Sequence, residues 1–248
     1  MLKTVILTLN EARHIVPCIK SVCWTDGVVV FDSYSTDDTV SLARQAGAEV
    51  LQHPFENYSQ QRNTALAAVD AEWVFFLDAD ERATPELGAE IRDVIANRDE
   101  AGWWIPRHNY IFGHRMRGTG WWPDSQLRLL RRARARYDPH RAVHEEAIID
   151  GAVGTLKHPL IHYNYTTLRQ FIAKQRKYIA FDVDILLRQD VRPKFYTPYT
   201  QALRHFWWRF VTLYGWRDGF HGVLLSALMS YYELHKYRQV RRAQQESQ

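Results

Sequence analysis

Two aspartates, Asp78 and Asp80, lie two positions apart at the end of the apolar run Val74–Leu77. Such a run predicts a buried strand, so both carboxylates lie where the chain leaves extended geometry and can turn toward one point. Carboxylate oxygens are ligands that Mg²⁺ and Mn²⁺ prefer, and these ions usually take substrate phosphates as further ligands. The pair therefore predicts a site for a divalent cation and a phosphorylated substrate.

Two other apolar runs also end in polar residues. Thr8, Asn10 and Glu11 follow the first run, and Asp32 ends the second. Asp32 is suited to accept hydrogen bonds from a base or a ribose, and Asn10 with the Thr8 backbone could hold the same nucleoside. Asp and Asn are also common in turns and helix caps for structural reasons alone. Three polar strand ends in one fold nevertheless favour a binding site.

The elements that must position these residues alternate between strand and helix. Apolar runs predict strands at 4–9, 27–32, 48–51 and 73–77, separated by helical patterns. This alternation is typical of right-handed βαβ units and predicts an α/β fold with a Rossmann-like, mostly parallel central sheet. Ligands of such sheets bind beyond the carboxyl ends of the strands, where the polar residues lie.

The pattern changes after about residue 100. Shorter segments at 103–106, 126–130 and 143–148 predict a smaller mixed sheet. From residue 166 the pattern is helical to the end, with breaks near Pro193 and Pro198. We therefore expect a helical region to follow the sheet-bearing part of the chain.

Composition excludes several classes of protein. The chain has 248 residues, of which 46% are hydrophobic and 24% charged, as in an ordinary globular protein. It has neither a Gly-x-Gly-x-x-Gly segment nor a P-loop, which argues against a dinucleotide oxidoreductase or an ATPase. Cys18 and Cys23 have no zinc-site spacing and favour a reducing compartment. Without a secretory-signal pattern or an apolar run of about 18 residues, we expect a cytoplasmic protein.

Further segments join the strand-end residues in one recognisable set: Gln60–Asn63, Gly120–Asp124, Gln126–Leu129 and Val143–Glu145. Together with residues 8–11, 32–39 and 78–81, they resemble the signature of family 2 glycosyltransferases with the GT-A fold. The longer set is similar to the subgroup that contains lipopolysaccharide core glucosyltransferases. The resemblance covers about residues 3–165. Leu9 departs from it, because the family often has Tyr there, and this weakens any aromatic contact to a base.

The resemblance implies a nucleotide-diphosphate sugar as donor, with a UDP-sugar expected, and inversion at the anomeric carbon. It also implies Mg²⁺ or Mn²⁺ as cofactor. By their places in the motifs, Thr8, Asn10, Glu11 and Asp32 would contact the uridine or its equivalent.

Other roles that the resemblance implies lie around the diphosphate. Asp78 would reach the ribose or the metal, Asp80 would ligate the metal, and Arg62 would lie near the phosphates, a role that its fork of donors suits. His162 is similar to a late histidine that GT-A enzymes often supply as a metal ligand. A lone His at a strand end is as readily structural.

An inverting transfer needs a general base that deprotonates the acceptor hydroxyl as it attacks. Asp124, about 45 residues after Asp80, resembles the place where the family has its catalytic acid. Its structural alternative is to cap a turn after Pro123. Glu145 is the competing base.

Charge divides the chain into an acidic and a basic part. Residues 1–160 have a net charge of −4 and residues 161–248 a net charge of +8. The basic part is also aromatic, with the segments His205–Phe210 and Leu213–Arg217. Trp and Tyr favour the headgroup level of a bilayer, and Arg favours an anionic surface, so we expect peripheral docking on the inner face of the cell membrane. A helix packed on the core or on another subunit is the structural alternative.

We thus expect a GT-A catalytic domain at 1–165 and a membrane-docking helical region at 166–248. Within the first, 1–100 would bind the nucleotide sugar and 101–165 would face the acceptor. The leading hypothesis is an inverting hexosyltransferase whose acceptor is a hydroxyl of a lipid-linked glycan, such as lipopolysaccharide core. Two alternatives stay open, a polyprenyl-phosphate glycosyltransferase and a non-catalytic membrane-bound protein that binds nucleotide sugars. Contact with nucleic acid is not expected, because it would leave the acidic site unexplained.

Overall fold

The structure is a computed structural model that describes residues 1–139 and 146–246. Internal contacts divide the chain into two compact units. The first comprises Met1–Arg107 and Ser125–His162, and the second comprises His108–Asp124 and Tyr163–Gln248. Two strands, β6 (Gly102–Ile111) and β12 (Leu160–Tyr165), begin in the first unit and end in the second.

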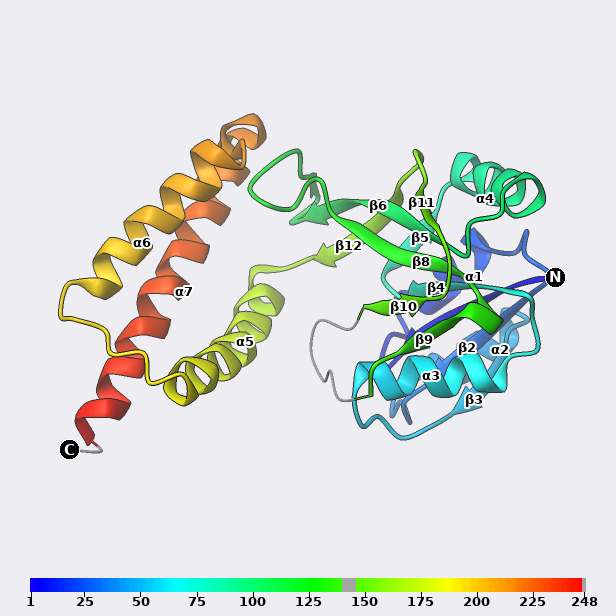
Figure 1. The fold of residues 1–248 in the computed structure, drawn as a ribbon, viewed down its shortest axis with the longest axis horizontal. Coiled ribbons are helices and arrows are strands. Elements are labelled where there is room, and N and C mark those ends of the chain that lie inside the picture. The colour runs from blue at the N-terminus through cyan, green and yellow to red at the C-terminus, as the bar shows by residue number, and fades with distance from the viewer. Residues whose placement is uncertain (140–145, 247–248) are drawn as a thin grey trace. The chain divides into compact units, whose positions relative to one another are not determined.

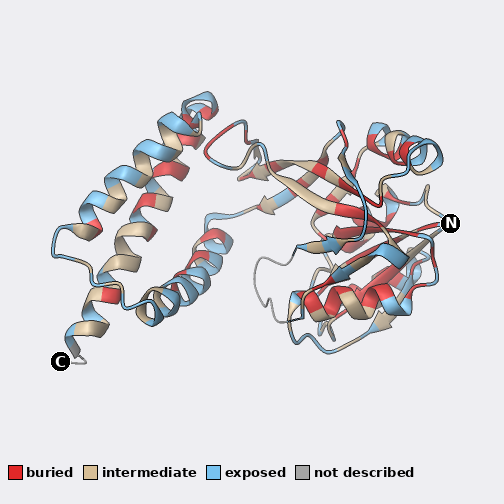
Figure 2. Ribbon diagram, viewed as in Figure 1, coloured by how far each residue is buried: buried red, intermediate tan, exposed pale blue. Residues whose placement is uncertain are grey.

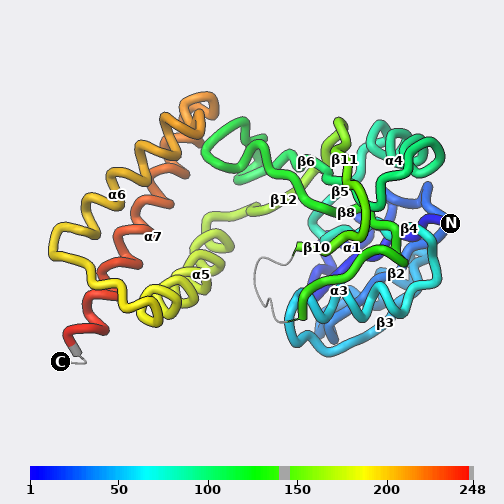
Figure 3. The backbone as a smooth tube through the Cα atoms, viewed as in Figure 1, coloured from blue at the N-terminus to red at the C-terminus, as the bar shows by residue number. Residues whose placement is uncertain are grey.

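The first unit is built on a mixed sheet, which can be followed along the chain in Figures 1 and 3. Its remaining strands are β1 (Leu2–Thr8), β2 (Gly27–Asp32), β3 (Glu49–Gln52), β4 (Trp73–Asp78), β5 (Glu81–Ala83), β8 (Ser125–Arg131) and β11 (Val153–Thr155). Two further strands, β9 (Ala135–Tyr137) and β10 (Ala147–Ile149), pair with each other as a separate antiparallel ribbon.

The four strands expected in the first hundred residues are confirmed, and they are parallel. β1 pairs with β2 on one side and β4 on the other, and β2 pairs with β3. The order is therefore β3-β2-β1-β4, after which β8 pairs with β4 and β6 in antiparallel fashion. The carboxyl ends of β1, β2 and β4 meet at one edge, because the strands run in the same direction.

Helices cover both faces of this sheet. Side chains of α1 (Ile15–Ser21), α2 (Thr39–Gln45) and α4 (Pro85–Asn97) pack on one face, and those of α3 (Tyr58–Ala68) pack on the other. Residues of β4 alternate between the two clusters, which is why this strand is apolar along its length until Asp78. Figure 2 shows the resulting burial of the central strands. The polar residues at the strand ends are thus held by a well-packed scaffold.

The second unit is mainly helical. It contains the end of β6 paired with β7 (His114–Arg115), the long helices α5 (Leu168–Arg188), α6 (Thr197–Trp207) and α7 (Gly219–Glu246), and the short turns η2 (Trp208–Thr212) and η3 (Gly215–Asp218). These two turns connect α6 to α7, whereas η1 (Arg132–Arg134) belongs to the first unit. Phe171 and Leu225 are fully buried in its core, where α5 and α7 pack together. The breaks expected near Pro193 and Pro198 are confirmed, because α5 ends before them and α6 begins at Thr197.

None of the helices within residues 1–139 and 146–246 has the length and apolar character needed to cross a membrane.

Candidate active site

The two aspartates lie at the end of β4. Asp78 is the last residue of the strand, and a tight turn through Asp80 leads into β5. The turn is closed by Glu81, whose Oε2 accepts a hydrogen bond from the Asp78 backbone N–H at 3.0 Å. The Asp78 side chain is 36% exposed and that of Glu81 is fully buried. Glu81 therefore belongs to the support of the site, and the aspartates to its surface.

Arginines from three elements surround this turn. Arg128, on β8, reaches both carboxylates: it pairs with Asp78 through two guanidinium nitrogens and with Glu81 Oε1 at 3.0 Å. Arg107 donates to the same Glu81 oxygen at 2.9 Å, and Arg62 of α3 lies 3.5 Å from Asp78 Oδ1. Asp78, Glu81 and the three arginines thus form one partly buried network.

The network fixes the protonation of Asp78. Burial alone would raise the pKa of this carboxyl, but the guanidinium groups of Arg128 and Arg62 outweigh it and hold the pKa well below its usual range. Burial would likewise lower the pKa of Arg128, and the charges of Asp78 and Glu81 raise it instead. The pair is therefore fully ionised at neutral pH.

Asp80 has a different neighbour. Its Oδ2 lies 3.4 Å from Nε2 of His162, whose side chain is only 8% exposed. The contact follows from strand pairing, because β12 runs antiparallel to β5 with His162 opposite Glu81. Strand register therefore brings a carboxylate and an imidazole together at the turn.

The Asp80–His162 pair fits a divalent cation. An oxygen and a nitrogen ligand lie within reach of one ion, and an octahedral ion bound to a nucleotide takes its remaining ligands from phosphate oxygens and water. Among the described residues there is no group of three or more His, Cys, Asp or Glu side chains able to hold a metal by itself. A cation here would need the substrate to complete its coordination.

The ends of β1 and β2 form a second polar network. Asp32 is fully buried and accepts hydrogen bonds from the Ser35 N–H at 2.9 Å and from Gln52 Nε2 at 3.0 Å. Asn10 has a positive φ of 56°, and its Oδ1 accepts from the Thr36 N–H at 2.8 Å. The two loops after these strands are therefore tied together by the residues expected to contact a nucleoside.

Thr8 and Glu11, which are also expected to contact a nucleoside, form hydrogen bonds through their backbone groups. Thr8 is 6% exposed, and its backbone oxygen accepts from the Ser33 N–H at 3.0 Å, which holds the ends of β1 and β2 together. The Glu11 N–H donates to Thr39 Oγ1 at 2.8 Å. Both residues lie at the edge of the sheet expected from the sequence.

A cavity of about 170 Å³ lies beside the arginine network in the first unit. Arg62 and Arg128 line it together with β8 residues, Tyr137 and Glu146. Two guanidinium groups at its wall suit the charge and geometry of phosphate oxygens.

The candidate bases lie apart from these residues in the chain. Asp124 belongs to the second unit, where its Oδ2 accepts from Nδ2 of the fully buried Asn109 at 2.8 Å. Asn109 also donates to the Trp121 carbonyl at 2.9 Å and accepts from Asn164 at 3.3 Å. The Asp124 carboxylate is thus oriented by a buried amide. Glu145 lies outside the described residues.

The motifs in the sequence indicate no role for three residues of this network, Glu81, Arg107 and Arg128. One signal was available for Arg128, since a single arginine in the apolar strand segment Leu127–Leu130 predicts a buried charge that needs a partner. The partners themselves become evident only from the pairing of β8 with β4.

Comparison with known proteins identifies the family. Residues 4–151 match the family model described as glycosyl transferase family 2. The chain belongs to this family. It is 32% identical over 207 residues to the lipopolysaccharide core biosynthesis glycosyltransferase LpsC of Rhizobium meliloti, covering 79% of this chain and 75% of LpsC. It is also 27% identical over 252 residues to an uncharacterized glycosyltransferase of Rickettsia felis, covering 94% and 88% of the two chains.

A solved structure supports the fold. Glucosyl-3-phosphoglycerate synthase from Mycobacterium tuberculosis, crystallised with Mn²⁺, UDP and phosphoglyceric acid, matches with a TM-score of 0.50 and 18% identity. The match covers 76% of this chain and 78% of that one. The predicted family and its GT-A type of mixed α/β fold are therefore confirmed.

Proposed function

We propose that this glycosyltransferase moves a hexose, with inversion, from a nucleotide-diphosphate sugar to a hydroxyl of a lipid-linked glycan such as lipopolysaccharide core. The observation that carries the proposal is the 32% identity to LpsC over most of both chains. The arginine-rich network beside the partly exposed Asp78 and Asp80 at a parallel-sheet edge supports a donor that carries a diphosphate.

The donor site is assigned to the first unit. The loops after β1 and β2, with Thr8, Asn10, Glu11 and Asp32, would hold the nucleoside. Arg62 would contact the phosphates, and Arg128 keeps Asp78 ionised and oriented toward the ribose or the cation.

Asp80 and His162, with Asp78 nearby in sequence, would hold Mg²⁺ or Mn²⁺. The mycobacterial neighbour was crystallised with Mn²⁺ and UDP, which supports this cofactor and a UDP-sugar donor. When bound, the cation would neutralise the diphosphate as it leaves.

Asp124 is assigned as the general base. Its hydrogen bond from Asn109 orients one carboxylate oxygen, and a general base must be held in place to take the proton of an acceptor hydroxyl. Such a base contributes roughly 10²- to 10⁴-fold in rate. A polyprenyl-phosphate acceptor is already an anion and needs no base, so an unaltered turnover of Asp124→Asn would favour that alternative.

The second unit is assigned to the membrane surface. Its exposed aromatic strip consists of Trp207, Trp208, Trp216 and Phe220, of which Trp207 is 65% and Phe220 76% exposed. Large aromatics on basic helices suit the headgroup level of an anionic bilayer. Docking there would place the enzyme on the inner face of the cell membrane, where a lipid-linked acceptor is available.

A thermal-shift screen tests the donor assignment. The full chain is heated with a panel of UDP-, GDP-, ADP- and CMP-sugars, with Mn²⁺ or with EDTA. A ligand at about one hundred times its Kd stabilises the folded state by about 2.7 kcal/mol, which corresponds to a rise in Tm of about 5–10 °C for a chain of this size. We expect one nucleotide class to give this rise only with Mn²⁺, and Asp80→Asn to abolish it. A flat response to every nucleotide sugar would contradict the proposal.

A further inference from the structure

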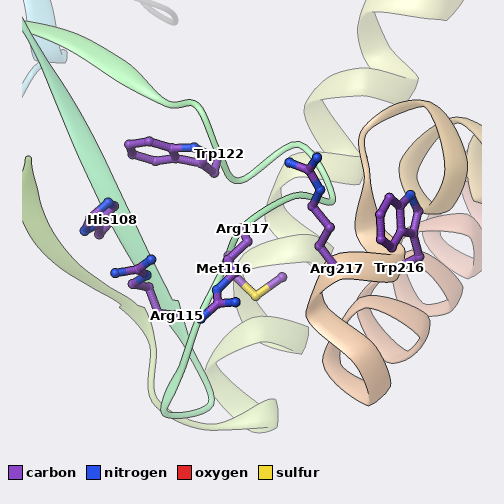
Figure 4. A pocket seen from close by; sticks show the side chains of 7 residues that line it. All are labelled: His108, Arg115, Met116, Arg117, Trp122, Trp216 and Arg217. Atoms are coloured by element: carbon purple, nitrogen blue, oxygen red, sulfur yellow. The ribbon is translucent and has the colours of Figure 1, made fainter.

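A second cavity, of about 650 Å³, lies entirely within the second unit and has no role in the donor site. We call it the arginine pocket, and Figure 4 shows its lining side chains. The lining includes His108, Arg115, Arg117, Trp122, Trp216 and Arg217. No acidic residue lines it among the described residues. Its wall therefore combines three guanidinium groups with two indoles.

The arginines are available for a ligand. Arg115, Arg117 and Arg217 are all exposed, and within the described part of the chain none has a carboxylate at salt-bridge distance. Arg217 instead lies over the rings of Tyr214 and Trp216, at 4.6 and 5.4 Å from their centroids. This stacking positions its guanidinium without neutralising it.

Asp218, which follows the lining residue Arg217, forms its contacts away from the pocket arginines' guanidinium groups. Asp218 is buried, and its Oδ1 accepts from the Arg117 backbone N–H at 2.7 Å and lies 3.3 Å from His114 Nε2. Its Oδ2 accepts from Thr119 Oγ1 at 3.3 Å. The Asp218 carboxylate thus holds the loop that carries Arg117, and it does not pair with the arginines of the pocket.

The two segments that carry the side chains of the pocket are joined by close contacts. The Thr119 N–H donates to the Leu213 carbonyl at 2.7 Å, and Arg209 donates to the Thr119 carbonyl at 2.7 Å. A Cβ at Gly118 would lie 2.4 Å from the Tyr214 carbonyl oxygen, so only glycine allows this approach. The loop after β7 and the turn η3 are therefore held against each other.

From these contacts we propose that the arginine pocket binds an anionic saccharide, one that carries a phosphate or a carboxylate, as part of the acceptor. Guanidinium groups recognise such anions with paired hydrogen bonds, and indole rings offer flat apolar surfaces to the faces of a sugar. The volume exceeds what one phosphate needs and lies in the range of sites for small organic ligands. Trp216 belongs both to the pocket and to the exposed aromatic strip, which suits a saccharide attached to a lipid.

The inference deepens the proposed function and rests on it, because only the proposed function makes the bound saccharide part of an acceptor. Its test uses the full chain with Mn²⁺ and saturating UDP, so that the donor site is occupied. Ligand-observed NMR titrations measure the Kd of glucose 6-phosphate, glucose and inorganic phosphate. We expect glucose 6-phosphate to bind at least about tenfold more tightly than either other probe, since only it engages both the guanidinium groups and the indoles.

Variants locate the binding. Arg115→Gln/Arg217→Gln should weaken glucose 6-phosphate binding by about tenfold or more, because each charged hydrogen-bonded contact is worth about that factor. Trp216→Ala should weaken glucose 6-phosphate binding more than inorganic phosphate binding, because it removes an indole while Arg217 keeps its contact with the Tyr214 ring. Arg192→Gln, which removes one charge from an exposed site of the same unit, should leave all three Kd values within about twofold. Equal binding of the three probes, or a double variant equal to wild type, would overturn the proposal.

One further measurement distinguishes a saccharide from a lipid headgroup as the ligand of the arginine pocket. A second one tests the donor site independently of the pocket. If the double variant abolished flotation with phosphatidylglycerol vesicles while the wild type bound no glucose 6-phosphate, the pocket would recognise headgroups and the saccharide assignment would be wrong. A UDP titration reports on the donor site alone. Absent UDP binding with intact binding of glucose 6-phosphate would refute the proposed function and leave an anionic-saccharide site.

Discussion

Arg128 gives the sharpest test of how the site is held together. Arg128 is 4% exposed and forms ion pairs with both Asp78 and the buried Glu81. Arg128→Gln therefore removes one positively charged partner from each of these two carboxylates. Breaking a buried ion pair on one side costs about 3–5 kcal/mol. We expect the lower limit, about 3 kcal/mol, because Glu81 keeps Arg107 at 2.9 Å and Asp78 is partly hydrated and keeps Arg62.

This cost can be measured as a melting temperature. For a chain of this size, 1 kcal/mol corresponds to about 2–4 °C, so Arg128→Gln should melt about 6–12 °C below the wild type in differential scanning calorimetry at pH 7. Arg128→Lys should fall between the two, because one ammonium group cannot reproduce a paired contact with Asp78 and still reach Glu81.

The matched control is Arg98→Gln, which removes an exposed arginine from the same unit and should change Tm by no more than about 2 °C. Adding Glu81→Gln to Arg128→Gln should recover part of the loss, since it removes the buried charge that has lost a partner. A melting temperature for Arg128→Gln within about 2 °C of the wild type would show that the network does not stabilise the site and would refute this reasoning.

Three further outcomes are expected. Asp124→Asn should lower kcat by roughly 10²-fold or more at saturating donor, with the donor KM unchanged, and near-native turnover would remove Asp124 as the base. Burial and the charge of Arg209 lower the pKa of His205 to about 4, below the 6.5 of the unfolded chain, so the unfolded state takes up a proton first on acidification. The free energy of unfolding should therefore fall from pH 6.5 toward pH 4, and His205→Gln should reduce this slope by up to about 1.4 kcal/mol per pH unit; identical slopes in denaturant unfolding would contradict the assignment. Trp207→Ser/Phe220→Ser should reduce recovery of the full chain with anionic vesicles, while equal recovery would argue against membrane docking by the exposed aromatic strip.

The central sheet was predictable because the burial of a strand is visible in the residues of that strand alone. Strands buried on both faces are apolar along most of their length, and the runs that end at Thr8, Asp32 and Asp78 show this pattern. The edge strand Glu49–Gln52 is only partly buried and has just two apolar residues. Because these strands are parallel, the polar residues at their carboxyl ends lie at the same edge of the sheet. The family resemblance added the names of the donor and the cation, and the comparisons confirm the family itself.

The supporting contacts were not predictable, because they depend on strand register between distant segments. His162 meets Asp80 through the antiparallel pairing of β12 with β5, some 80 residues earlier in the chain. Arg128 meets Asp78 through the pairing of β8 with β4. The packing of residues 108–124 with the C-terminal helices was not predictable either, since that contact depends on glycines such as Gly118 lying against distant backbone. The roles of the site residues and the membrane contact stay predictions.

Pulsed electron paramagnetic resonance of Mn²⁺ bound to the full chain tests the central claim most directly. With UDP present, the spectrum should show ³¹P couplings from the diphosphate and a ¹⁴N coupling from the His162 imidazole, and His162→Gln should lose only the ¹⁴N coupling. Mn²⁺ that stays free in solution in the presence of UDP, or bound Mn²⁺ without any ³¹P coupling, would contradict a site in which Asp80 and His162 hold a cation against the donor diphosphate.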